Sequence, residues 1–133
     1  MTRRRRVGRD ESGLTSVEWA LVMPVVVLLI MSGVQVALWA HAAHVATAAA
    51  EEGLVAARAA GGSAEAGEAR ARAVLAQLGP ELVTSPAVHA ERSVDRASVV
   101  VSGYSTVVIP GLRFPVHGQA ASVVERFVAE DER

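Results

Sequence analysis

The chain has 133 residues, a formal net charge of −1 and 51% hydrophobic residues, and it contains no cysteine. This length leaves room for one membrane helix and one small domain. The absence of cysteine excludes disulfides, thiol chemistry, zinc–thiolate sites and a lipoprotein anchor, so a small outer domain must be held together by packing or by partners.

The near-neutral net charge hides an asymmetry between the two ends of the chain. Residues 1–13 carry five arginines against Asp10 and Glu11, a net of +3, whereas residues 14–133 carry eight arginines against twelve acids, a net of −4. A basic segment beside an apolar stretch stays in the cytoplasm, so we expect the C-terminal part to lie outside. Four consecutive arginines can also bind nucleic acid, but the acidic remainder of the chain leads us to expect no such partner.

An uncharged run of 22 residues extends from Trp19 to Ala40. As a helix this run is about 33 Å long, which matches a hydrocarbon core of about 30 Å. The run therefore predicts a membrane-inserted helix beginning at Leu14. Pro24 cannot donate to the carbonyl four residues before it and predicts a kink near Met23, which membrane helices tolerate.

The helix is predicted to continue beyond the apolar run, because His41–Ala60 consists almost entirely of good helix formers. Gly61 and Gly62 end it. Trp39 and the nearby histidines are predicted to mark the outer membrane interface. One face collects residues at three- and four-residue spacing: Trp39, Ala43, Ala46, Ala50, Leu54 and Ala57.

A second, shorter helix is predicted from about Ala64 to Leu78. Ser63 is placed to cap its first turn, and Gly79–Pro80 stops it. Its expected partner is the alanine face of the first helix. Its apolar stripe is expected to consist of Ala71, Val74, Leu75 and Leu78.

The valine-rich remainder predicts three strands, at about Ala87–Ser93, Ala97–Ile109 and Phe114–Val128. A hairpin turn is expected at Val94–Arg96 and a bulge at Gly118. We therefore expect an α+β fold in which a three-stranded antiparallel sheet packs on the outer half of the long helix.

The sequence carries none of the common catalytic or nucleotide-binding motifs. His41 and His44 lie one turn apart and could share a metal, but nothing nearby in the sequence completes a ligand set. We expect no catalysis, no cofactor and no metal site.

The N-terminal segment resembles a class III signal of type IV pilin-like proteins: a basic leader ends at Gly13, four residues follow, and then come Glu18, an aromatic residue and a long apolar helix. The whole chain resembles TadE-like minor pilins, or pseudopilins, of the tight-adherence (Flp) pilus system. The family core A-L-V-x-P corresponds to Ala20–Pro24, and Trp19 stands where the family often has Phe or Tyr.

This resemblance implies a function in pilus biogenesis, with adhesion or secretion as the outcome. A prepilin peptidase would cut between Gly13 and Leu14, removing residues 1–13 as a cytoplasmic leader. Glu18 would become the fifth mature residue and would pair with the N-terminal amine of a neighbouring subunit. The implied partners are the membrane, the peptidase, other pilin and pseudopilin subunits, and the Tad inner-membrane assembly platform.

Elementary chemistry agrees with these roles. Glycine lets a protease approach the backbone closely, and we expect the cut segment to be extended. A carboxylate at a membrane edge is costly unless it is paired or hydrated, so Glu18 could also be a merely hydrated residue at the cytoplasmic interface. The expected organisation is a leader (1–13), a transmembrane and assembly helix (14–40) and an extracytoplasmic α+β domain (41–133) of type IV pilin-like form.

Two other interpretations remain open. Ala40-His41-Ala42 fits a signal-peptidase site, so the protein could be secreted after a cut behind Ala42, although the apolar run exceeds the usual length of a signal sequence. Alternatively, an uncleaved signal anchor could present the outer domain in the envelope. The mature N-terminus distinguishes all three interpretations.

Overall fold

The computed structural model describes the backbone of residues 11–124 and the side chains of residues 17–124. Two helices are followed by three strands. Their bounds are α1 (Glu11–Arg58), α2 (Ala64–Leu78), β1 (Val83–Arg92), β2 (Arg96–Ser105) and β3 (Pro115–Val123).

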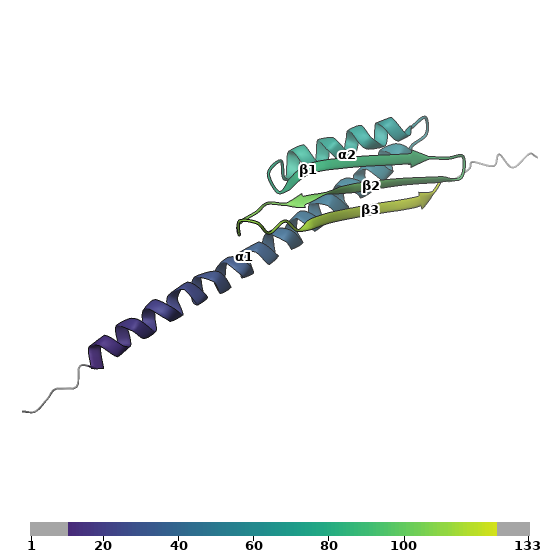
Figure 1. Ribbon diagram of the computed structural model, residues 1–133. Helices are drawn as coiled ribbons and strands as arrows, with labels where there is room; N and C mark the ends of the chain where they lie inside the picture. Colours follow the sequence, from purple (N-terminus) through teal and green to yellow (C-terminus); the bar gives the residue numbers. More distant parts are fainter. Residues whose placement is uncertain (1–10, 125–133) are drawn as a thin grey trace, which may run out of the picture.

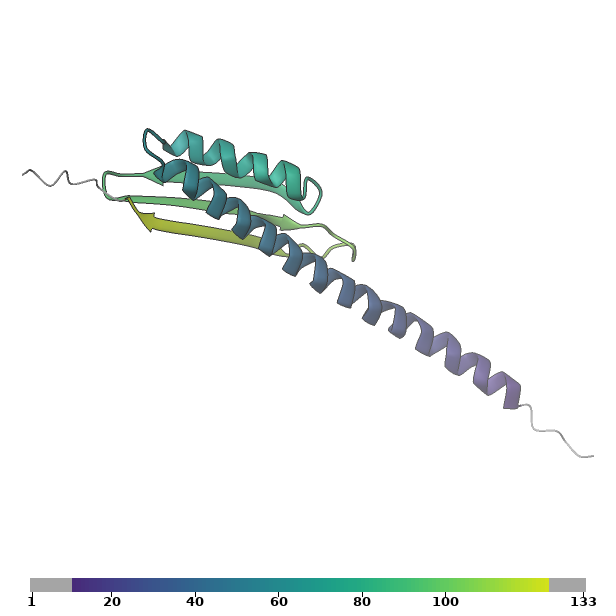
Figure 2. The same ribbon diagram turned by 180° about the vertical axis from the view of Figure 1, so that it is seen from behind.

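The elements form two layers at one end of a long helix (Figure 1). The C-terminal half of α1 and the whole of α2 cover one face of the antiparallel sheet, whose strand order is β1-β2-β3 (Figure 2). Within the sheet, α1 packs mainly against β2 and β3, and α2 packs against α1 and β1. The predicted α+β fold, with a sheet on the outer half of a long helix, is confirmed.

α1 is one helix of 48 residues that continues without a break through Pro24. It begins at Glu11, three residues before the predicted start at Leu14, so the Gly13–Leu14 bond lies inside its first turn instead of in an extended segment. It ends at Arg58, slightly before the predicted Ala60. Residues 1–10 of the predicted leader lie outside the described residues, and the kink at Pro24 stays a prediction.

Small residues form most of the buried face of α1. Of the predicted face, Ala46, Ala50, Leu54 and Ala57 are buried, whereas Trp39 stays 42% exposed. The prediction missed four buried residues on the same side: Ala42, Val45, Ala49 and Gly53. The buried stripe is wider than one heptad-like seam because α1 contacts both α2 and the sheet.

α2 has the predicted bounds and the predicted cap, since the Ser63 hydroxyl accepts a hydrogen bond from the Ala66 N–H at 3.1 Å. Its buried face differs at both ends from the predicted stripe. Gly67 is buried, and Leu78, which was expected in the core, is 55% exposed. A Cβ on Gly67 would lie 2.8 Å from the Ala57 side chain, so glycine sets the close approach of the two helices.

The sheet is regular between β2 and β3 and irregular at the start of β1. Val101 faces Gly118 in unbroken register, so the predicted bulge at Gly118 is wrong. The register shift occurs instead between Thr84 and Ala87 in β1. This segment contains Ser85, which has φ +50°, and a proline that cannot donate to the ladder.

Gly118 has a different role, which is close packing. A Cβ at this position would lie 2.4 Å from the backbone carbonyl carbon and oxygen of Ala46 in α1. Contacts of that length do not occur between side chain and backbone, so only glycine lets β3 approach the helix this closely. A glycine inside a strand indicates either a bulge or a close approach of another backbone, and the sequence alone does not distinguish the two.

Side chains also fasten the sheet to the helices. Arg92, at the end of β1, donates through Nη1 to the carbonyls of Ala57, Ala59 (3.1 Å) and Gly62 (2.6 Å), which lie at and beyond the C-terminal end of α1. A cation at these carbonyls complements the helix dipole. Glu68 of α2 accepts from Arg72 and from the Ala90 N–H, and these two hydrogen bonds lower the pKa of its carboxyl.

We predict that Gly118→Ala lowers the free energy of unfolding by about 1–3 kcal/mol, because the added methyl group pushes β3 away from α1. Thermal or chemical unfolding of the full chain in detergent measures this loss. Ala121→Val is the matched control, because Ala121 lies on the exposed face of the same strand. Equal stability of the Gly118→Ala variant and the wild type would contradict the close contact.

Candidate functional site

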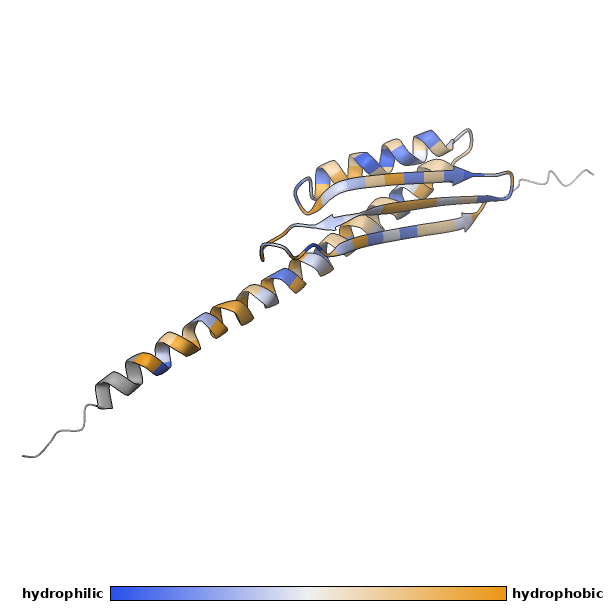
Figure 3. Cartoon of the chain, in the orientation of Figure 1, coloured by the Kyte–Doolittle hydropathy of each residue, from blue (hydrophilic) through white to orange (hydrophobic). Residues whose placement is uncertain are grey.

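The part of α1 from Val17 to Val34 projects away from the rest of the molecule and exposes almost only apolar side chains (Figure 3). Leu21, Leu29 and Ile30 are each more than 60% exposed. Among the described residues this is the one helix long and apolar enough to cross a membrane, and only 6% of its apolar window is buried within the protein. Its exposure distinguishes it from the core helix of a soluble domain.

Glu18 and Trp19 lie exposed near the beginning of this projecting segment, where they border a shallow hollow together with Val22. Pro24 follows about one and a half turns later. The surroundings of Gly13 and of the Leu14 side chain lie outside what the structure describes. The assigned roles of these positions in processing and assembly therefore stay predictions, and the structure adds that all of them belong to one continuous helix.

The base of the α+β domain is attached to α1 by Gln35, which the sequence analysis treated only as part of the apolar run. Gln35 is 2% exposed. Its Nε2 donates to the Thr106 carbonyl at 2.9 Å, and its Oε1 accepts from the N–H groups of Val108 at 2.8 Å and Ile109 at 3.4 Å. A single amide thus satisfies three backbone groups of the segment between β2 and β3.

Trp39, one turn further along α1, makes the next attachment. Its indole N–H donates to the Pro115 carbonyl at 2.9 Å, at the first residue of β3. Packing of the α+β domain on α1 thus begins at Gln35, ahead of the predicted boundary between residues 40 and 41. A glutamine in an apolar run was the available signal for this contact, since buried amides require partners.

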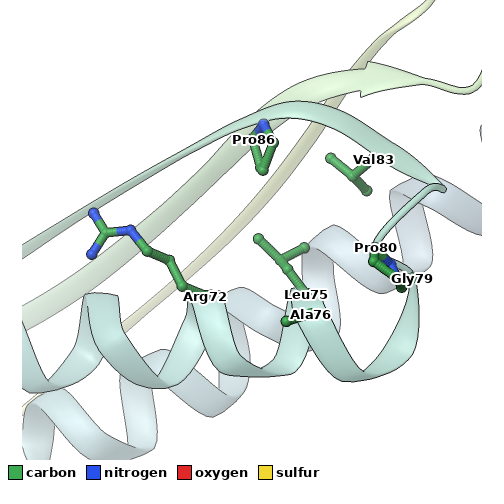
Figure 4. A pocket seen from close by; sticks show the side chains of 7 residues that line it. All are labelled: Arg72, Leu75, Ala76, Gly79, Pro80, Val83 and Pro86. Carbon is green, nitrogen blue, oxygen red and sulfur yellow. The ribbon is translucent and has the colours of Figure 1, made fainter.

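Two further features of the described residues bear on metal and ligand binding. His41 and His44 are both exposed on α1, and no group of three or more His, Cys, Asp or Glu side chains in the described residues is arranged to hold a metal. A groove of about 300 Å³ lies between α2 and the start of β1 (Figure 4). Leu75, Val83 and Pro86 line it, and its ionisable lining residue, Arg72, is paired with Glu68.

A small α+β domain on a single exposed apolar helix, long enough to cross a membrane, is consistent with a membrane protein. The family model described as TadE-like protein matches residues 13–54, the range that holds Gly13, Glu18, Pro24 and Gln35. This match confirms the resemblance inferred from the sequence over these residues, and the likeness of the rest of the chain stays a prediction. A search of curated proteins and a search of solved structures found no match. The family match and the apolar helix together fit a membrane protein associated with a Tad pilus.

We predict that Gln35→Leu loosens the segment between β2 and β3, because it leaves the N–H of Val108 and the carbonyl of Thr106 without their partner. Each buried unsatisfied group costs about 1–3 kcal/mol. Hydrogen exchange of the full chain in detergent should show faster exchange at Val108 and Ile109. Gln77→Leu is the control at an exposed glutamine of α2, and unchanged exchange in the Gln35 variant would contradict the attachment.

Proposed function

We propose that this chain is a TadE-like pseudopilin, a minor subunit or assembly factor of a Flp-type pilus that supports pilus biogenesis and, through it, adhesion or secretion. The single observation that carries the proposal is the projecting apolar helix with Glu18 near its start and Gly13 five positions earlier. The family match over residues 13–54 supports it, because the match covers this segment.

The projecting helix suits insertion first in a membrane and then between subunits of a filament. Its exposed side chains are large and aliphatic, and lipid tails and the apolar faces of neighbouring helices solvate such side chains equally well. Val17–Val34 comprises 18 residues, about 27 Å of helix, close to the roughly 30 Å of a hydrocarbon core. The basic N-terminal segment favours a cytoplasmic N-terminus and an outer α+β domain.

Processing by a prepilin peptidase requires access to the Gly13–Leu14 bond. In the structure this bond lies in the first turn of α1, and the first N–H groups of a helix have no intrahelical partners. Helix ends therefore open at low cost, and glycine lowers that cost further. We infer that the peptidase binds the segment with this first turn opened.

The small α+β domain suits a minor subunit better than a major Flp pilin, because major Flp pilins resemble this chain only in its leader and its apolar helix. The alternative cut behind Ala42 would divide α1 at a fully buried side chain and would remove Gln35 and Trp39 from the domain that they hold. An uncleaved signal anchor presenting the α+β domain is the second candidate. We expect no enzymatic activity in either case.

The decisive experiment is the N-terminal sequence and intact mass of the protein recovered from membranes of its own host. We predict a start at Leu14 in the wild type. Gly13→Val should abolish this species and leave the longer chain, because bulk at the cut position blocks the protease. An uncut wild-type chain in cells with active prepilin peptidase would favour the anchor, and a start at Ala43 would favour secretion.

We predict that Glu18→Ala permits cleavage and impairs pilus assembly, because the carboxylate no longer pairs with the new N-terminal amine of a neighbour. Such a pair offsets desolvation and sets axial register. Pilus counts by electron microscopy, alongside the mass of the processed chain, measure the two effects separately. Glu51→Ala is the control, since Glu51 is exposed on the same helix outside the apolar segment. Normal piliation in the Glu18 variant would refute the pairing role.

A further inference from the structure

The segment between β2 and β3, residues 106–114, is unusually apolar for a loop at the surface. It reads T-V-V-I-P-G-L-R-F and contains one charged residue, Arg113. Val107 is 42% exposed and Leu112 is 46% exposed. Loops usually place polar side chains at the surface, and clustered exposed apolar side chains indicate a binding surface. We call this segment the β2–β3 loop.

The β2–β3 loop lies at the end of the α+β domain that faces the projecting half of α1 (Figures 1 and 2). Gln35 binds its backbone at Thr106, Val108 and Ile109. The neighbours of Gln35 on α1, Val34 and Val36, are 45% and 59% exposed. The exposed apolar surface of the helix therefore continues directly onto the loop.

The two tryptophans of α1 indicate where the two bilayer interfaces fall along the helix. Trp19 and Trp39 are 20 residues apart, which is about 30 Å along a helix and equals the thickness of a hydrocarbon core. Tryptophan favours both interfaces of a bilayer. Trp39 is hydrogen-bonded to the Pro115 carbonyl, and Pro115 pairs with Tyr104 across the sheet. These three residues therefore lie at the same height along α1.

The β2–β3 loop lies on the membrane side of that level, because it connects Tyr104 and Ser105 to Pro115 and is bonded to Gln35, one turn of helix before Trp39. The hydrocarbon core reckoned from Trp19 extends about 20 residues, to about Leu38. A loop bonded at Gln35 therefore falls at or within the outer boundary of the bilayer.

Part of the loop backbone is already hydrogen-bonded within the protein. The N–H groups of Val108 and Ile109 are bonded by Gln35, and the N–H of Leu112 donates to the Ile109 carbonyl at 3.2 Å. Pro110 has no N–H to satisfy. Unbonded backbone groups exclude loops from the hydrocarbon core, so the remaining groups of this loop require the hydrated headgroup boundary. Arg113 lies 4.3 Å from the centre of the Tyr104 ring, at the level where a cation meets lipid phosphates.

We propose that the β2–β3 loop inserts into the outer leaflet of the membrane that α1 crosses, so that the protein contacts lipid at two places and its α+β domain is held against the bilayer surface. The proposal rests on the membrane placement of α1 proposed above. The occupant of the apolar surface formed by Val107, Ile109, Pro110 and Leu112 is the acyl and headgroup boundary of phospholipids.

The absence of native cysteine makes a direct test clean, because a single introduced cysteine takes one nitroxide label. Leu112→Cys and Val107→Cys report the loop, and Leu28→Cys reports the centre of the projecting helix. Val94→Cys is the matched control, since Val94 is 72% exposed in the turn between β1 and β2 at the opposite end of the domain (Figure 1). Each variant is the full chain in phosphatidylcholine–phosphatidylglycerol vesicles at a high lipid-to-protein ratio.

The measurement is power-saturation EPR with oxygen, which partitions into lipid, and with a water-soluble nickel chelate. We expect the oxygen-to-nickel accessibility ratio at Leu112 and Val107 to exceed that at Val94 severalfold and to fall below that at Leu28. Ratios at the loop equal to that at Val94, with Leu28 in lipid, would overturn loop insertion and leave the membrane helix intact. A water-exposed Leu28 would overturn both proposals.

A different occupant gives a different signature. If a second copy of the chain covers the loop, the Leu112 label should be inaccessible to both reagents, and diluting the protein with more lipid should restore access to nickel. That result would overturn the lipid assignment. Circular dichroism of each labelled chain checks that it retains its fold, and both loop positions are exposed enough to accept the label.

Discussion

The helix α1 exposes apolar side chains along its first half and packs against the rest of the protein along its second half, and the change occurs at Gln35. Before this residue α1 exposes large aliphatic side chains to its surroundings, and after it the buried face consists mostly of alanine. The amide of Gln35 can be buried because it meets three backbone groups of the β2–β3 loop. This one side chain therefore fixes where the α+β domain begins on the helix, and with it where the free apolar segment ends.

The α+β domain has few large side chains in its core and is held together by close approach. Ala46 meets Gly118 of β3, and Gly53 meets Gly67 of α2, so backbones lie where side chains would ordinarily separate them. Dispersion depends steeply on distance, so such contacts compensate for the small area that each residue buries. Such packing does not tolerate substitution, because any carbon added at these glycines collides with backbone atoms that cannot move independently.

The parts of the fold that depend on local sequence were predictable. Ser63 and Gly79 bound α2 as expected, and alternating valines identified the sheet. The parts that depend on distant partners were not. Leu78 resembles a core residue by spacing but lies at the end of α2 with its side chain exposed, and Gly118 is explained only by Ala46, 72 positions away. At the candidate site, the roles of Gly13 and Glu18 come from the resemblance, that of Pro24 comes from the sequence, and all three stay predictions, whereas the partners of Gln35 became visible only in three dimensions.

The α+β domain is fastened to α1 at both of its ends. Gln35 and Trp39 hold the loop and the start of β3 near the middle of the helix, and Arg92 holds the end of β1 to the carbonyls at the helix terminus. The strands run roughly along the helix between these attachments (Figure 1). A mechanical load applied along α1 is therefore borne in shear by all of these bonds together. Such a geometry resists peeling of the domain from one end, and it transmits tension from the projecting segment of α1 to the far end of the domain.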